Sequence, residues 1–114
     1  MTSPITTHVL DTARGAPAAG VHVTLEHESV PGRWSTAGEG ATDADGRLRT
    51  LLPAGSLRAG AYRLVFDAGA YFQDQGVNAF WRQVTIEFVV HDASAHFHVP
   101  LLVSPFGYST YRGS

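Results

Sequence analysis

The dominant pattern along this chain is an alternation of apolar and polar residues. It is clearest over residues 83–90, where the apolar residues Val84, Ile86, Phe88 and Val90 alternate with Gln83, Thr85 and Glu87. A period of two predicts a β-strand that turns one face toward a core. The same alternation predicts strands within residues 21–26, 62–67 and 96–101.

Turn residues delimit further strands. The signals are Gly15, Pro17 and Gly20 after a strand at residues 5–11, Pro31-Gly32 before one at 33–42, Asp45-Gly46 before one at 47–51, a loop at 53–60, and Pro105 to Gly107 before the last strand. Asp-Gly is a strong tight-turn dipeptide. These signals together predict about eight short strands, at the spacing of a β-sandwich.

One segment departs from this pattern. Residues 68–80 have weak strand character, and a short helix is expected near Tyr71 to Gln75, ended by Gly76. A length of 114 residues fits one compact domain. We therefore expect an all-β fold, a two-sheet sandwich with one short helix, as a single domain over residues 1–114.

Composition excludes several kinds of chemistry. The chain has no cysteine, which rules out disulfides, thiolate metal sites and a cysteine nucleophile. All eight basic residues are arginine, and without lysine there is no Schiff-base chemistry. The net charge of -2, with no basic run, gives no electrostatic basis for nucleic-acid binding.

No targeting or membrane segment is evident in the sequence. The first residues are polar, and the longest apolar run, residues 99–103, contains Pro100. Such a run is far too short to cross a bilayer. We expect a cytoplasmic protein without membrane contact.

Two histidines, His96 and His98, occupy alternate positions of one predicted strand. They would share a face about 6.5–7 Å apart. They form either an exposed pair or a pair for metal binding or acid–base chemistry. Zinc needs three or four ligands, and although His8 could be a third, no acidic residue has ligand spacing, so no metal is predicted.

Three other features carry candidate chemistry. His8 shares a predicted strand face with Leu10 and is either structural or a partner for a second histidine. Arg47 opens a strand and is either a surface residue or a fixed guanidinium facing an anionic or carbonyl-rich ligand. The C-terminal run from Gly107 to Ser114 has two tyrosines and predicts a terminus held in structure rather than frayed.

Three motifs resemble those of one family. They are Thr7-His8-Val9-Leu10-Asp11, Thr42-Asp-Ala-Asp-Gly-Arg47, and the long stretch from His98-Val-Pro-Leu-Leu to Tyr111-Arg-Gly-Ser114. In this order they resemble the 5-hydroxyisourate hydrolases, the transthyretin-related enzymes of purine degradation. The terminal Tyr-Arg-Gly-Ser separates these enzymes from the transthyretin hormone carriers. One departure is Phe80-Trp81-Arg82-Gln83, where many relatives carry an acidic, proline-containing sequence.

This resemblance implies a transthyretin-like fold assembled as a homotetramer, a dimer of dimers, with active sites in the channel between dimers. The implied catalytic residues are His8, Arg47, His98, Tyr111 and Ser114, of which His8, Arg47 and Tyr111 also bind substrate. His96 falls outside the matched set. The resemblance implies neither metal nor cofactor.

The implied reaction is hydrolysis of 5-hydroxyisourate to 2-oxo-4-hydroxy-4-carboxy-5-ureidoimidazoline in urate catabolism. His8 and His98 would activate water for attack on a ring carbonyl, without a choice between them as the base. Arg47 would stabilise the oxyanion, Tyr111 would orient substrate or relay a proton, and the Ser114 carboxylate would accept a hydrogen bond near an imidazole. The alternatives are a non-catalytic transthyretin-like carrier of small molecules and a structural sandwich module.

Overall fold

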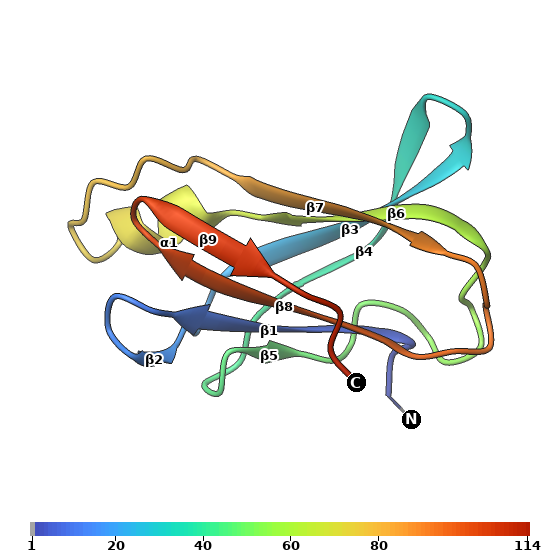
Figure 1. Cartoon of the computed structure of the whole chain (residues 1–114), viewed down its shortest axis with the longest axis horizontal. Helices are drawn as coiled ribbons and strands as arrows, with labels where there is room; N and C mark the ends of the chain where they lie inside the picture. The colour runs from blue at the N-terminus through green and yellow to red at the C-terminus, as the bar shows by residue number, and fades with distance from the viewer. Residues whose placement is uncertain (1) are drawn as a thin grey trace.

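The computed structural model describes residues 2–114 and arranges nine strands and one helix over them. The elements are β1 (Ile5–Asp11), β2 (Ala16–Pro17), β3 (His22–Val30), β4 (Arg33–Ala41), β5 (Arg47–Leu48), β6 (Gly60–Phe66), α1 (Ala68–Gln73), β7 (Val84–Val90), β8 (Phe97–Ser104) and β9 (Gly107–Thr110). Figure 1 shows the strands running along the long axis of the molecule, with α1 at one end.

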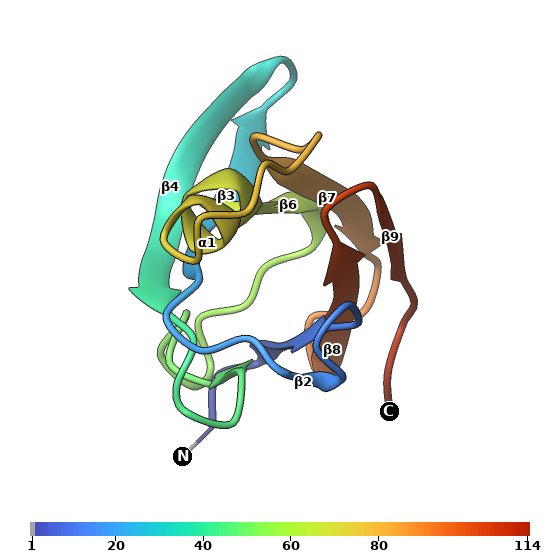
Figure 2. The same cartoon turned by 90° about the vertical axis from the view of Figure 1, so that its left-hand side faces the viewer.

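The strands form two sheets. One has the order β4-β3-β6-β7, and the other has the order β2-β1-β8-β9, with β5 also paired to β1. Figure 2 shows the two layers curving around a common interior, with β7 and β9 on the same side of the molecule. The predicted two-sheet sandwich with one short helix is therefore confirmed.

The core lies between the sheets and follows the predicted alternation. In β6, Tyr62, Leu64 and Phe66 are buried, and in β8, Phe97, Val99 and Leu101 face the same interior. Burying a side chain of this size contributes about 1.5–3 kcal/mol. The alternation places the intervening residues of β1 and β8, among them His8 and His98, on the outer face of their sheet.

The helix and several strands differ from their predicted bounds, since β3 continues to Val30 and β8 to Ser104. The helix begins earlier, at Ala68, because the Asp67 carboxylate accepts a hydrogen bond from the Ala70 amide and caps it. Strand β5 ends at Leu48 rather than continuing to residue 51. Beyond it, the Leu52 amide donates to the Ser3 hydroxyl, and the chain turns to bury Leu52.

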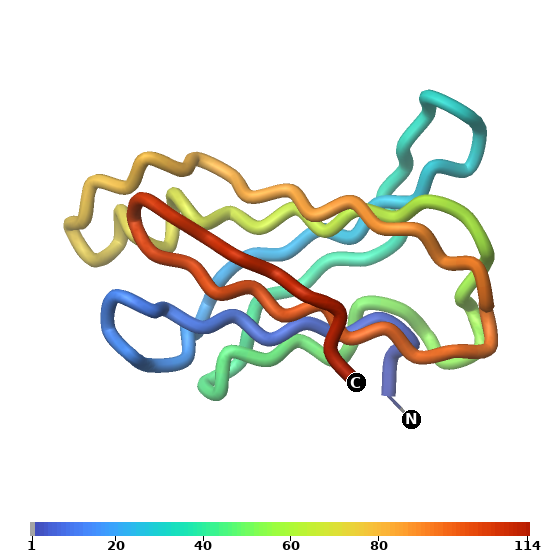
Figure 3. Tube along the Cα trace, viewed as in Figure 1, coloured from blue at the N-terminus to red at the C-terminus, as the bar shows by residue number. Residues whose placement is uncertain are grey.

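The C-terminal tail turns back after β9 and lies against the start of β8. Figure 3 shows this path of the chain. Gly113 forms an isolated bridge to His98. The tail is therefore held in structure, as the sequence predicted, and the structure shows that β8 is its partner. In residues 2–114 no helix is long and apolar enough to cross a bilayer.

Candidate functional site

His8 and Arg47 are direct neighbours in antiparallel pairing between β1 and β5. The turn before Arg47 positions both. The Asp43 carboxylate accepts hydrogen bonds from the amides of Asp45 and Arg47 at 2.9 and 3.0 Å. The bond from the Arg47 amide is the main cause that lowers the pKa of Asp43, so the turn is held by a charged acceptor.

The same turn determines which ring nitrogen of His8 is free. Gly46 has φ 77°, a conformation that favours glycine, and it lets the chain reverse tightly against Val9. The carbonyl oxygen of Asp45 then lies 2.9 Å from His8 Nε2. A carbonyl can only accept, so Nε2 carries a proton, and Nδ1 of a neutral His8 keeps its lone pair.

His98 lies on the next strand of the sheet. Parallel pairing of β1 with β8 places it opposite Thr6, and the Thr6 hydroxyl lies 2.8 Å from His98 Nδ1. Burial lowers the pKa of His98, and the positive charges of Arg47, His8, His96 and Arg49 lower it further. The imidazole therefore favours its neutral form, which can accept a proton at neutral pH.

The C-terminal tail closes over this strand. The Gly113 amide donates to the His98 carbonyl at 2.7 Å, and the Arg112 guanidinium lies 4.6 Å from the centroid of the Phe97 ring. The arginine thus makes a cation–π contact with the residue between His96 and His98. These two contacts bring Ser114 to the rim of the site.

A cavity of about 220 Å³ lies on this face of the sheet. Its lining includes Thr6, Arg47, Arg49, His96, His98 and Ser114. The cavity therefore brings together two guanidinium groups, the imidazole of His98 from β8, the imidazole of His96 from just before it, and Ser114. This combination suits an anionic or carbonyl-rich small molecule.

The structure does not bring every predicted residue into that cavity. His8 is adjacent to it through Arg47, but Tyr111 is 60% exposed and lines a separate, mostly apolar groove with Arg112 and Phe88. Within one chain, Tyr111 and the cavity are thus distinct. Its role in catalysis stays a prediction.

Sequence reasoning did not select five residues of the cavity: Thr2, Thr6, Thr7, Arg49 and His96. The alternation of residues along a strand could have identified two of them. Thr6 shares the strand face of His8, and Arg49 follows Arg47 by two residues. His96 was noticed but set outside the site. In the structure its Nε2 lies 3.3 Å from the Thr6 hydroxyl, which also contacts His98.

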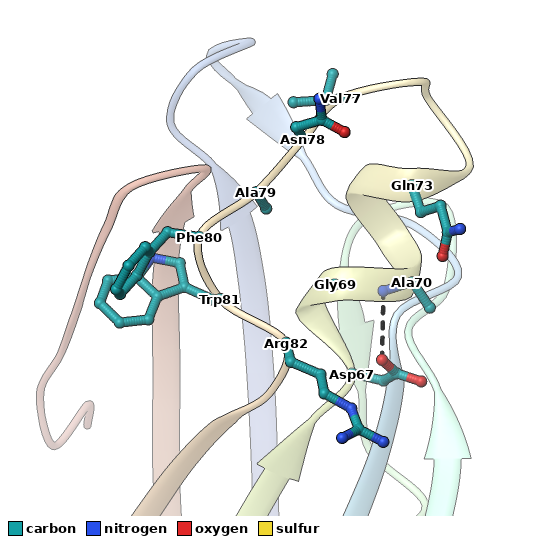
Figure 4. A pocket seen from close by; sticks show the side chains of 10 residues that line it. All are labelled: Asp67, Gly69, Ala70, Gln73, Val77, Asn78, Ala79, Phe80, Trp81 and Arg82. Atoms are coloured by element: carbon teal, nitrogen blue, oxygen red, sulfur yellow. Dashed lines mark hydrogen bonds between the residues drawn. The ribbon is translucent and has the colours of Figure 1, made fainter.

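A larger cavity, of about 410 Å³, lies elsewhere. Figure 4 shows it between α1 and the segment from Val77 to Arg82. None of the predicted catalytic residues lines it. The Phe80-Trp81-Arg82 segment, which departs from the family pattern, is therefore away from the candidate site.

The described residues include no cluster of side chains suited to hold a metal ion. Over residues 2–114, no three His, Asp or Glu side chains gather closely enough to hold an ion. The independence of activity from metal stays a prediction.

Comparison with known proteins places this geometry in a family. The model described as HIUase/Transthyretin family matches residues 5–113. A 5-hydroxyisourate hydrolase of Mesorhizobium japonicum is 50% identical over 115 residues, which span 96% of this chain and 91% of the relative.

Two solved structures match the fold. The 5-hydroxyisourate hydrolase of Klebsiella pneumoniae superposes with a TM-score of 0.85 at 39% identity, over 99% of this chain and 98% of the other. Sea bream transthyretin in complex with thyroxine gives a TM-score of 0.91 at 32% identity, over 96% and 94%. The fold, the motifs and these matches agree, and the chain belongs to the HIUase/Transthyretin family.

Proposed function

We propose that this protein hydrolyses 5-hydroxyisourate to 2-oxo-4-hydroxy-4-carboxy-5-ureidoimidazoline. The observation that carries the proposal is His98, a half-buried imidazole with a lowered pKa, in one cavity with Arg47. The relatives named hydrolase are 50% and 39% identical to the chain, against 32% for the transthyretin. The enzyme is therefore favoured over the carrier.

The proposed chemistry begins with water held near His98. His98 accepts a proton at Nε2 as the water oxygen bonds to a ring carbonyl carbon. The carbonyl oxygen becomes an oxyanion, and the guanidinium groups of Arg47 and Arg49 stabilise its charge. The carbon–nitrogen bond of the ring then breaks and the proton held by His98 passes to the leaving nitrogen. The water oxygen remains in the new carboxyl group, which releases its own proton to solvent.

His8 and the tail complete the proposed site. His8, held through Nε2 by the Asp45 carbonyl, offers the lone pair of Nδ1 as a hydrogen-bond acceptor to substrate or to the attacking water. The Ser114 carboxylate provides a fixed acceptor beside the imidazoles. Tyr111 orients substrate or relays a proton, and no metal or other cofactor takes part.

The assembly we propose is a homotetramer, a dimer of dimers, with sites in the channel between dimers. Strands β7 and β9 end their sheets, and their unpaired edges are open to another chain. Exposed apolar side chains gather on or near these edges, with Val89 at 51%, Tyr108 at 44% and Phe106 at 75%. A second copy would cover them and enclose a site that one chain leaves open.

A spectrophotometric assay tests the function. Freshly generated 5-hydroxyisourate decays spontaneously, and the protein is expected to accelerate this decay, whereas a folded His98→Ala variant is expected to approach the uncatalysed rate. Binding of the compound without acceleration would instead support a carrier. One domain over residues 1–114 and a cytoplasmic location belong to the same proposal, and fractionation of expressing cells tests the location.

A further inference from the structure

The hydroxyl of Thr6 lies between two imidazoles. It is 2.8 Å from Nδ1 of His98 and 3.3 Å from Nε2 of His96. Thr6 is only 5% exposed, whereas His96 is exposed to solvent. The hydroxyl therefore connects a half-buried ring of the cavity to a ring in contact with water.

A hydroxyl in this position couples its two partners. It has one proton to donate and can accept up to two hydrogen bonds. If Nε2 of His96 carries a proton, that proton is donated to Thr6, and the proton of Thr6 is free to bond Nδ1 of His98. A neutral His98 then carries its own proton on Nε2.

The opposite arrangement reverses both bonds. If Nε2 of His96 has a lone pair, Thr6 donates to it and accepts the Nδ1 proton of His98. Nε2 of His98 then keeps its lone pair. Only this second form of His98 can take a proton from water at Nε2.

We propose that His96, acting through the Thr6 hydroxyl, is a positioning residue that selects the tautomer of His98. Doubly protonated His96 holds His98 as a donor at Nε2, and neutral His96 permits the form that acts as a base. This inference rests on the proposed function, since it assigns the control of the base in that reaction.

The surroundings of His98 keep its ring neutral, so its tautomer, rather than its charge, decides whether it can act as a base. Burial and nearby positive charge lower its pKa, so the neutral ring persists over a wider pH range. The charged groups around the pair are Arg47 and Arg49 from β5 and the residues after it, His8 from β1, and the tail at Ser114. Substitution of Thr6 leaves all of these in place.

Nitrogen-15 NMR of the histidine rings tests the coupling without any assay of activity. As the pH of the unsubstituted protein is lowered, His96 gains its second proton. Over that same pH range, Nε2 of His98 is expected to change from an unprotonated to a protonated nitrogen. In Thr6→Val, which keeps the shape but lacks the hydroxyl, this coincidence should disappear. Thr6→Ser should preserve it, and His91→Ala, which removes another exposed histidine, should leave it unchanged.

The second variant is His96→Ala, which tests the proposal even if Thr6→Val does not fold. It should abolish the pH-dependent change at His98 Nε2. The fall of kcat/KM at low pH should lose the part that follows protonation of His96. At high pH, kcat should change less than about threefold. A His98 tautomer that ignores the titration of His96 in the unsubstituted protein would overturn the inference. Absence of hydrolysis by the unsubstituted protein would instead overturn the proposed function.

Discussion

The amide of Gly113 donates to the carbonyl of His98, and a Cβ atom added at Gly113 would lie 2.6 Å from Cδ2 of the His98 ring. The imidazole thus rests against a position where the tail has no side chain. The tail and the catalytic ring are packed together closely, and a larger residue would force one of them to move.

Gly113→Ala should consequently displace the His98 ring and lower kcat by at least about tenfold, since misplacement of a catalytic group by 1 Å costs up to about 100-fold. The matched control is Gly107→Ala, whose added Cβ would meet only the Ser104 hydroxyl at 3.7 Å. Steady-state kinetics and circular dichroism of both variants check this. Equal activity of the two folded variants would contradict it.

His98→Ala and His8→Ala should each reduce kcat by at least about 100-fold, the low end of general acid–base contributions. His96→Ala should be mild at high pH, because its proposed action is indirect. The measurement is steady-state kinetics of the three variants at the pH optimum. If His96→Ala were as damaging there as His98→Ala in a folded protein, our assignment of the base would be wrong.

The acid limb of kcat/KM should have its midpoint below the ordinary imidazole pKa of about 6.5. Burial, the first cause, and the charge of Arg47, the second, lower the pKa of His98. The base form therefore survives at lower pH, and activity falls only as the pH drops through the lowered value.

Arg47→Ala should reduce kcat/KM strongly, since it removes a contact to substrate and a stabilising charge in the transition state. It should also move the acid limb toward higher pH, because one cause of the low pKa is gone. Arg47→Lys is the control that keeps the charge, and its acid limb should stay near that of the unsubstituted protein. pH-rate profiles of both variants decide the point.

Val89→Lys should weaken the proposed tetramer, because it places a charge on the free edge of β7. Val30→Lys is a matched control, since Val30 is similarly exposed, at 54%, but ends β3 away from that edge. Analytical ultracentrifugation should show smaller species for Val89→Lys alone. A fully active monomer of the unsubstituted protein would refute the shared channel.

Chelation should leave activity unchanged, since the proposed mechanism uses only imidazoles, arginines and the chain terminus. The check is an assay before and after treatment with a strong chelator. Activity that is lost on chelation and restored by zinc would contradict the prediction and make His96 a candidate ligand.

Local pattern determined most of the fold. Alternation in β6, β7 and β8 predicted which side chains enter the core, because a strand turns successive residues to opposite faces. The Asp45-Gly46 turn was also predicted from its residues, since glycine there adopts a positive φ. The bounds of α1 were not predicted well, because its capping by Asp67 depends on where β6 ends.

The candidate site, like the fold, was predicted from the sequence only in part. The sequence by itself determined that His96 and His98 share a face, and its motifs singled out His8, Arg47 and the tail. Only the tertiary structure decided that Thr6 links the imidazoles of His96 and His98, that Arg49 joins the cavity and that Tyr111 lies in a separate groove. Face alternation is a property of one strand, whereas these contacts depend on the pairing of β1 with β8 and on the return of the tail over Phe97, residues far apart in the chain.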